Sequence, residues 1–123
     1  MGALILLALL AAAADPPPPS VGERSFQRCY SCHSVDPNEQ GLPGPNLSGV
    51  VGRRAAALEG FAYSPAMRQA GARGLTWTDE TLDRFLADPE AVVPGTDMFM
   101  PPMRDPAERA ALIDYLRGLG SSR

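Results

Sequence analysis

Both cysteines and the single histidine of this 123-residue chain fall within one short stretch. Cys29, Cys32 and His33 belong to the string Cys-Tyr-Ser-Cys-His. On a helix, spacings of three and four residues place side chains on the same side, so the two thiols and the imidazole would all face one partner. A partner that meets these three groups at once must be large and flat.

A haem group meets this requirement. Its two vinyl groups can form thioether bonds with the thiols while the histidine nitrogen binds the iron, and Cys-x-x-Cys-His is a known attachment pattern for haem. A thioredoxin-like dithiol would need alternating strands and helices, which the sequence does not indicate. A structural zinc site needs four ligands, and a disulfide across so short a loop would constrain little. We therefore interpret the string as the covalent attachment site of one haem c.

The second axial ligand of the iron would decide between an electron carrier and a haem that binds ligands or peroxide. The chain has no second histidine, but the proline-rich segment 93–103 contains Met98, Met100 and Met103. Methionines more often fill gaps in a core than bind metals. This segment by itself leaves the identity of the second ligand open.

The elements that must position these residues are helical, without convincing strand alternation, so we expect an all-α fold of about four to five helices. A first helix should begin near Ser20 and carry the 29–33 group, and residues 36–51 should form an extended loop. A short helix is expected at 64–69. Thr78 can cap a helix over 79–88 that Pro89 ends. Leu82, Phe85 and Leu86 would share one face of that helix.

The last helix has the strongest signals. Asp105 is a suitable N-cap, Pro106 suits the first helical position, and Glu108 stands where a capping box would place it. An apolar stripe of Leu112, Tyr115, Leu116 and Leu119 follows at helical spacing. We expect this stripe to pack against another helix.

Residues 1–14 are apolar and end in small side chains, which is typical of a secretory signal. Residues 15–20 form a Pro-rich linker, and residues 21–120 form the single domain. An uncleaved membrane anchor is the alternative, although the apolar run is shorter than the roughly 20 residues that span a bilayer. We therefore expect export to the periplasm. The protein would contact a membrane only through its partners or through such an uncleaved anchor.

The charge balance narrows the range of partners. The formal net charge is -3, the isoelectric point is near 5.0, and the chain contains no lysine. Nucleic-acid binding requires a basic surface, so we exclude that class of function.

Several separated motifs, in order, resemble class I cytochrome c of the bacterial periplasmic type, which is similar to mitochondrial cytochrome c. The matching segments are 22–33, 44–53, 61–66, 75–82, 86–89, 94–98 and 108–116. The resemblance implies a small cytochrome c fold wrapped around one covalent haem. It also implies that Gly22 and Phe26 pack the first helix against Tyr115 and Leu116.

The resemblance assigns roles to individual residues. The pattern Pro-Gly-Thr-x-Met makes Met98 the second axial ligand beside His33, with Met100 as its closest rival. The carbonyl of Pro45 would accept the other ring proton of His33. Donors around a haem propionate would be Arg53, Tyr63, Trp77 and Thr96.

The implied function is one-electron transport between respiratory or photosynthetic complexes, without catalysis. A cytochrome bc-type complex would be the donor, an oxidase or reaction centre the acceptor, and the protein would be a monomer. The alternatives are an electron-transfer subunit of a periplasmic dehydrogenase or oxidase, or a haem peroxidase if Met98 is not bound. Phe85 replaces a tyrosine of the mitochondrial pattern, and Glu90 and Asp97 stand where its docking surface is basic. We therefore expect a partner that is less acidic or that docks through apolar contacts.

Overall fold

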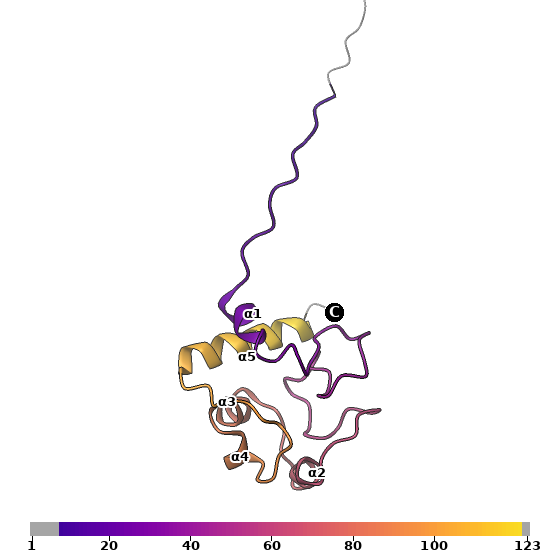
Figure 1. Ribbon diagram of the computed structural model, residues 1–123, viewed down its shortest axis with the longest axis vertical. Helices are drawn as coiled ribbons and strands as arrows, with labels where there is room; N and C mark the ends of the chain where they lie inside the picture. The colour runs from indigo at the N-terminus through magenta and orange to yellow at the C-terminus, as the bar shows by residue number, and fades with distance from the viewer. Residues whose placement is uncertain (1–7, 122–123) are drawn as a thin grey trace, which may run out of the picture.

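The computed structural model describes residues 8–121, and within them it contains five helices and no strand beyond one isolated bridge between Arg54 and Thr76. The expected all-α fold is confirmed. The helices are α1 (Val21–Phe26), α2 (Pro65–Ala72), α3 (Asp79–Ala87), α4 (Pro89–Val92) and α5 (Pro106–Ser121). Long loops connect them, and α5 lies across the top of the body in the view of Figure 1.

Residues 8–20 have no helix or strand and are exposed, and they extend away from the body (Figure 1). The first half of the expected leader, residues 1–7, lies outside the described residues. Over the part of the chain that the structure describes, no helix combines the length and apolarity that crossing a membrane requires.

Helix α1 begins where expected but ends earlier. The hydroxyl of Ser20 caps it by accepting a hydrogen bond from the amide of Glu23, at 3.1 Å. The helix ends at Phe26, so the expectation that it carries Cys29 to His33 is wrong. Residues 27–32 instead form successive turns, including a bond from the His33 amide to the Cys29 carbonyl, at 2.9 Å. This bond spans four residues as in a helix, so it still keeps the attachment string compact.

Helices α1 and α5 pack closely through a residue without a side chain. A Cβ on Gly22 would come within 2.3 Å of the Ala111 carbonyl oxygen and 2.6 Å of Tyr115 Cβ. Beside this contact the Phe26 and Tyr115 rings are 5.8 Å apart, and Leu116 is buried. The predicted packing of the first helix against the last is confirmed.

Glu108 is used differently from the sequence expectation. Its carboxylate does not close a capping box but accepts a hydrogen bond from Ser25 in α1, at 3.0 Å, and pairs with Arg28, also at 3.0 Å. Asp105 caps α5 through its own carboxylate, which accepts from the Ala107 amide at 2.9 Å. Because α1 packs close to α5, the Ser25 hydroxyl and the Arg28 guanidinium come within reach of Glu108. The spacing of residues in the sequence could not indicate these contacts.

Helix α3 carries the capping box of this fold. The Thr78 hydroxyl accepts from the Thr81 amide while the Thr81 hydroxyl accepts from the Thr78 amide. The predicted apolar face is confirmed, because Leu82, Phe85 and Leu86 are all buried. Pro89 ends α3 and also begins the one-turn helix α4.

Two ion pairs join α5 to α3. Arg109 contacts Asp83 at 2.7 Å, and Arg117 contacts Asp79. Of the apolar stripe on α5, Leu112 and Leu116 are buried, whereas Tyr115 and Leu119 are half-buried. These contacts fix the helices that form one wall of the cavity described next.

Candidate functional site

A cavity of about 320 Å³ lies between the helices and the long loops. Its size is within the range of cofactor sites in proteins. Segments from many parts of the chain line it, from Arg28 near the start to Leu116 in α5. The nine residues to which the sequence analysis assigned a role at the haem all line this one cavity: Cys29, Cys32, His33, Pro45, Arg53, Tyr63, Trp77, Thr96 and Met98.

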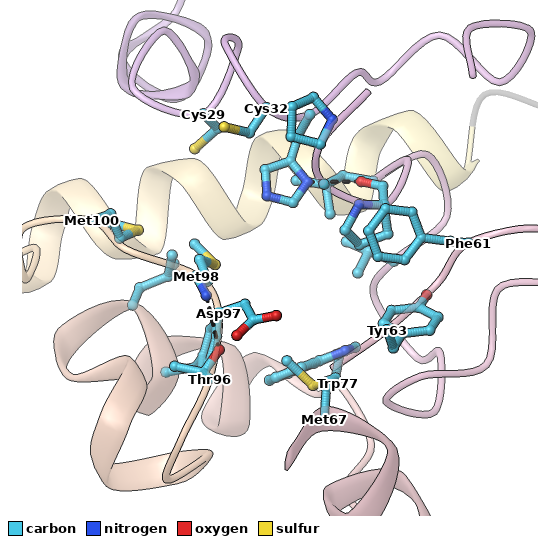
Figure 2. A pocket seen from close by; sticks show the side chains of 18 of the residues that line it. Cys29, Cys32, Phe61, Tyr63, Met67, Trp77, Thr96, Asp97, Met98 and Met100 are labelled. Carbon is cyan, nitrogen blue, oxygen red and sulfur yellow. Dashed lines mark hydrogen bonds between the residues drawn. The ribbon is translucent and has the colours of Figure 1, made fainter. Parts of the chain in front are cut away.

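Cys29 and Cys32 lie together at one end of the cavity (Figure 2). Both are free thiols, and Cys29 is buried while Cys32 is exposed. Burial raises the pKa of the Cys29 thiol; the neighbouring Arg28 opposes this shift. Among the described residues, no group of three or more His, Cys, Asp or Glu side chains is arranged to hold a metal ion directly. The thiols therefore face a partly open, mainly apolar cavity and form no disulfide with each other.

His33 is buried, with 8% of its surface exposed, and its ring is oriented by the backbone. Its Nδ1 atom lies 2.7 Å from the Pro45 carbonyl oxygen. A carbonyl can only accept, so Nδ1 carries the proton and Nε2 keeps its lone pair. Burial lowers the pKa of His33, against the opposing effect of this hydrogen bond, so the ring is held neutral. The imidazole is thus prepared to bind a metal through Nε2.

Gly44 makes this ring position possible. A Cβ at this residue would lie 2.5 Å from His33 Cε1 and 2.7 Å from its Nδ1. The Gly44 amide also donates to the Cys32 carbonyl, at 2.7 Å. Any side chain here would push the ring out of its hydrogen bond to Pro45.

Two of the three methionines in the 93–103 segment line the cavity. Met98 and Met100 are half-buried at its edge (Figure 2), whereas Met103 is 1% exposed, in the core, and does not line the cavity. The Met98 amide donates to the Thr96 hydroxyl, at 3.2 Å, which holds the loop in a tight turn. The cavity thus removes Met103 from the candidates and leaves Met98 and Met100.

The polar residues of the cavity differ in how many donors they have free. Arg53 donates from Nη1 to the Asn46 carbonyl at 2.8 Å and from Nη2 to the Ser48 carbonyl at 2.6 Å. Its guanidinium has five N–H groups, so three remain after these bonds. Burial lowers the pKa of Arg53, although the nearby Tyr63 opposes that shift, so the cation lies in a partly desolvated place.

Tyr63, Trp77 and Thr96 keep their donors available. The Tyr63 hydroxyl only accepts, from the Leu58 amide at 3.3 Å, and the Thr96 hydroxyl only accepts from Met98. Among residues 8–121 no hydrogen bond from the indole N–H of Trp77 is found, and this N–H is open to the cavity, since no fully buried polar side-chain atom of the described residues lacks a partner. Figure 2 shows these three side chains away from the cysteine end of the cavity.

Met67 and Phe61 line the cavity without a role in the sequence analysis, whereas Phe85 lines it as a residue that the sequence had singled out for its missing hydroxyl. Met67 of α2 and Phe61 line the cavity beside Tyr63, and the Phe61 and Tyr63 rings are 4.8 Å apart, edge to face. Phe85 is buried against Trp77, with ring centroids 4.9 Å apart, and brings no hydroxyl to the site. The spacing of Met67 after the Ser64 cap was the available signal, but it could not show which face of α2 turns inward.

Comparison with known proteins gives one consistent result. The family model described as cytochrome c matches residues 20–120. The chain is 43% identical over 95 residues to cytochrome c2 iso-2 of Magnetospirillum fulvum, covering 77% of this chain and 95% of that protein. It is also 43% identical over 95 residues to cytochrome c2 of Rhodomicrobium vannielii, covering 77% and 74%.

Solved structures agree. Cytochrome c2 from Rhodospirillum centenum superposes with a TM-score of 0.74 at 33% identity, covering 80% of this chain and 94% of that one. Cytochrome cH from Methylobacterium extorquens gives a TM-score of 0.71 at 39% identity, covering 80% and 95%.

Proposed function

The chain belongs to the cytochrome c family, and on that premise we propose which of its residues hold the haem and where its electrons pass. It binds one covalent haem c and is an electron carrier between respiratory or photosynthetic complexes, not an enzyme. When bound, the haem iron supplies a one-electron couple between its ferrous and ferric states.

The residues around the cavity fit this group. In our proposal Cys29 and Cys32 form the two thioether bonds, His33 binds the iron through Nε2, and Met98 supplies the other axial ligand. The observation that carries the proposal is the hydrogen bond of 2.7 Å between His33 Nδ1 and the Pro45 carbonyl. It leaves Nε2 as the only ring nitrogen able to bind iron, in the same cavity as both thiols and the Met98 thioether. A ring fixed in this way is also a stronger donor.

The propionates would lie opposite the thioether bonds, because the vinyl and propionate groups are at opposite edges of haem. Tyr63, Trp77 and Thr96, away from the cysteine end, would donate to them with their free O–H and N–H groups. Arg53 would act with its positive charge and its remaining N–H groups, since two already bind backbone carbonyls. Burying these carboxylates without such donors would be costly.

With His33 and Met98 both bound to it, the iron would have no position open to a substrate, which suits a carrier. An apolar cavity with a thioether ligand favours the ferrous state, so we propose a raised reduction potential. We further propose that residues 1–14 direct export and are cleaved, that 15–20 is a linker, and that a monomer works in the periplasm. A cytochrome bc-type complex would reduce it, and an oxidase or reaction centre would oxidise it.

The absorption spectrum of the purified holoprotein in both oxidation states tests the ligand proposal. We expect low-spin bands with the weak near-red band of a ferric iron–methionine bond. Met98→Ala should abolish that band, and Met100→Ala should retain it. High-spin ferric iron at neutral pH, or a native spectrum in Met98→Ala, would contradict the assignment.

A further inference from the structure

Phe99 is a large apolar side chain in an unusual place. It directly follows Met98, lines the mouth of the cavity and is 94% exposed. Outside the N-terminal segment, the other exposed large apolar residues that the structure describes are Val21 and Tyr30, and neither lines the cavity. An aromatic ring held in water at this position gains free energy when another apolar surface covers it.

The charged side chains that line the cavity differ in whether they have hydrogen-bond or ion-pair partners. Three charged side chains line the cavity: Arg28, Arg53 and Asp97. Arg28 is paired with Glu108, and Arg53 donates to two backbone carbonyls. Asp97 is exposed and has no hydrogen bond or ion pair with any described residue. The free charge beside the Phe99 ring is therefore negative.

We propose that Phe99 and Asp97 form the docking site for a redox partner whose contact surface is an apolar patch flanked by an arginine or lysine. This inference rests on the proposed carrier function and adds the chemistry of the partner. The carboxylate steers the basic group of the partner during encounter, and the ring supplies the apolar contact. For an acidic partner surface this face offers only Arg28, which is already paired with Glu108, and Arg53, which is half-buried and bonded to two backbone carbonyls.

Small redox reagents of different charge and shape can test this proposal in the haem-loaded protein. Tris(phenanthroline)cobalt(III) is an aromatic cation that accepts one electron from the ferrous protein and becomes cobalt(II), with no bond made or broken. Hexacyanoferrate(III) is an anion that accepts one electron in the same way. Hexaammineruthenium(II), a cation without aromatic ligands, donates one electron to the ferric protein.

Asp97→Asn should slow the reactions of both cations by about threefold at low salt and accelerate that of the anion, with the differences fading at high salt. Opposite effects on the two oxidants would show that the substitution changes the electrostatic attraction of the reagent. A raised reduction potential of the protein would instead slow both oxidants. Glu80→Gln removes the same charge from an exposed position in α3 outside the cavity, and its rates should match those of the wild type.

Phe99→Ala should slow the reaction with the aromatic cation by about threefold and leave the other two reactions unchanged. Val21→Ala, at an exposed position in α1, should leave all three rates unchanged. Binding can be measured without electron transfer by titrating the ferric protein with tris(phenanthroline)cobalt(III) and following amide NMR shifts, which should centre on residues 97–100.

Equal rates in Asp97→Asn and Glu80→Gln, or shifts centred elsewhere, would overturn the docking site while leaving the carrier function intact. A protein that exchanges no electron with any reagent would overturn the carrier function itself.

Discussion

At the scale of single residues, the imidazole of His33 is held by its neighbours on two sides. The Pro45 carbonyl accepts its Nδ1 proton, and Gly44 leaves room for the ring. Both neighbours lie in the loop between α1 and α2, so no helix fixes their positions. The orientation of one ligand therefore depends on a glycine in the cavity wall, whose missing side chain leaves room for the ring.

Gly44→Ala should displace the His33 ring, because the new Cβ would lie within 2.5 Å of Cε1. We expect a loss of about 1–3 kcal/mol in the unfolding free energy of the holoprotein, as for other overpacked sites, together with a weakened iron–histidine bond. Urea unfolding and the resonance Raman iron–histidine region would measure the two effects.

Gly118→Ala is the matched control for this substitution. Its Cβ would meet nothing within 4 Å, and alanine favours the helix by up to about 1 kcal/mol. If Gly44→Ala were as stable as this control, with an unchanged spectrum, the proposed role of Gly44 would be wrong.

At the scale of elements, α1 and α5 cross at a contact where two backbones nearly touch. Gly22 allows this approach, and Glu108 reaches from α5 to Ser25 and Arg28 in the chain around α1. The short α1 has only six residues and could not persist alone, so packing on α5 must stabilise it. The same packing holds the attachment string near the wall of the cavity.

Gly22→Ala should separate these helices, since its Cβ would fall 2.3 Å from the Ala111 carbonyl oxygen. The expected loss is again about 1–3 kcal/mol of unfolding free energy. Thermal unfolding followed by circular dichroism would detect it. The wild-type midpoint in this variant would show that the two helices pack less closely than described.

The Asp79–Arg117 pair between α3 and α5 gives a pH dependence. The hydrogen bond from Arg117 lowers the pKa of Asp79 in the folded protein. A lowered carboxyl pKa stabilises the fold above the unfolded-state pKa of about 3.9, and that contribution is lost as pH falls through the folded-state pKa. Asp79 is exposed, so the effect should be small.

Asp79→Asn should therefore be slightly less stable than the wild type at neutral pH, and the difference should shrink as the pH falls below the unfolded-state pKa of about 3.9. Urea unfolding midpoints across that range would measure it, with Glu80→Gln as the neighbouring control. A difference that stayed constant down to low pH would mean that the carboxylate charge contributes nothing.

At the scale of the whole molecule, the five helices and the long loops of the described residues surround one cavity, and residues 8–20 stand apart from them (Figure 1). Residues 8–14 are exposed and have no hydrogen bond to the body. The cavity walls come from both ends of the chain, so the prosthetic group would lie at the centre of the core. Much of the stability of this domain should then depend on the bound haem.

Replacing residues 1–14 with an unrelated export signal should leave the folded domain unchanged. We expect the same spectrum and a thermal midpoint within about 1 °C, because the described part of the segment, residues 8–14, is exposed and exposed termini contribute little stability. Mass spectrometry of the mature N-terminus would show where cleavage occurs. A large loss of stability would show that the segment belongs to the domain.

The sequence by itself determined the chemistry and the helical class. The Cys29–His33 string, the Met98 loop and the caps of α3 and α5 are local patterns, in which the residue type and its spacing carry the information. All nine predicted site residues consequently line one cavity. The structure departs from the sequence predictions at the end of α1 at Phe26, in the use of Glu108, in the length of α2, which runs to Ala72, and in the additional helix α4.

Only the tertiary structure decided which distant groups meet. In the structure Met103 lies in the core, Met67 lines the cavity and Phe99 is exposed to solvent. Glu108 accepts a hydrogen bond from Ser25 of α1 and does not cap its own helix. Sequence spacing reports neighbours within one helix, whereas these outcomes depend on how separate elements approach each other. That approach is governed by packing across the whole core, where a missing side chain at Gly22 or Gly44 matters as much as any side chain present.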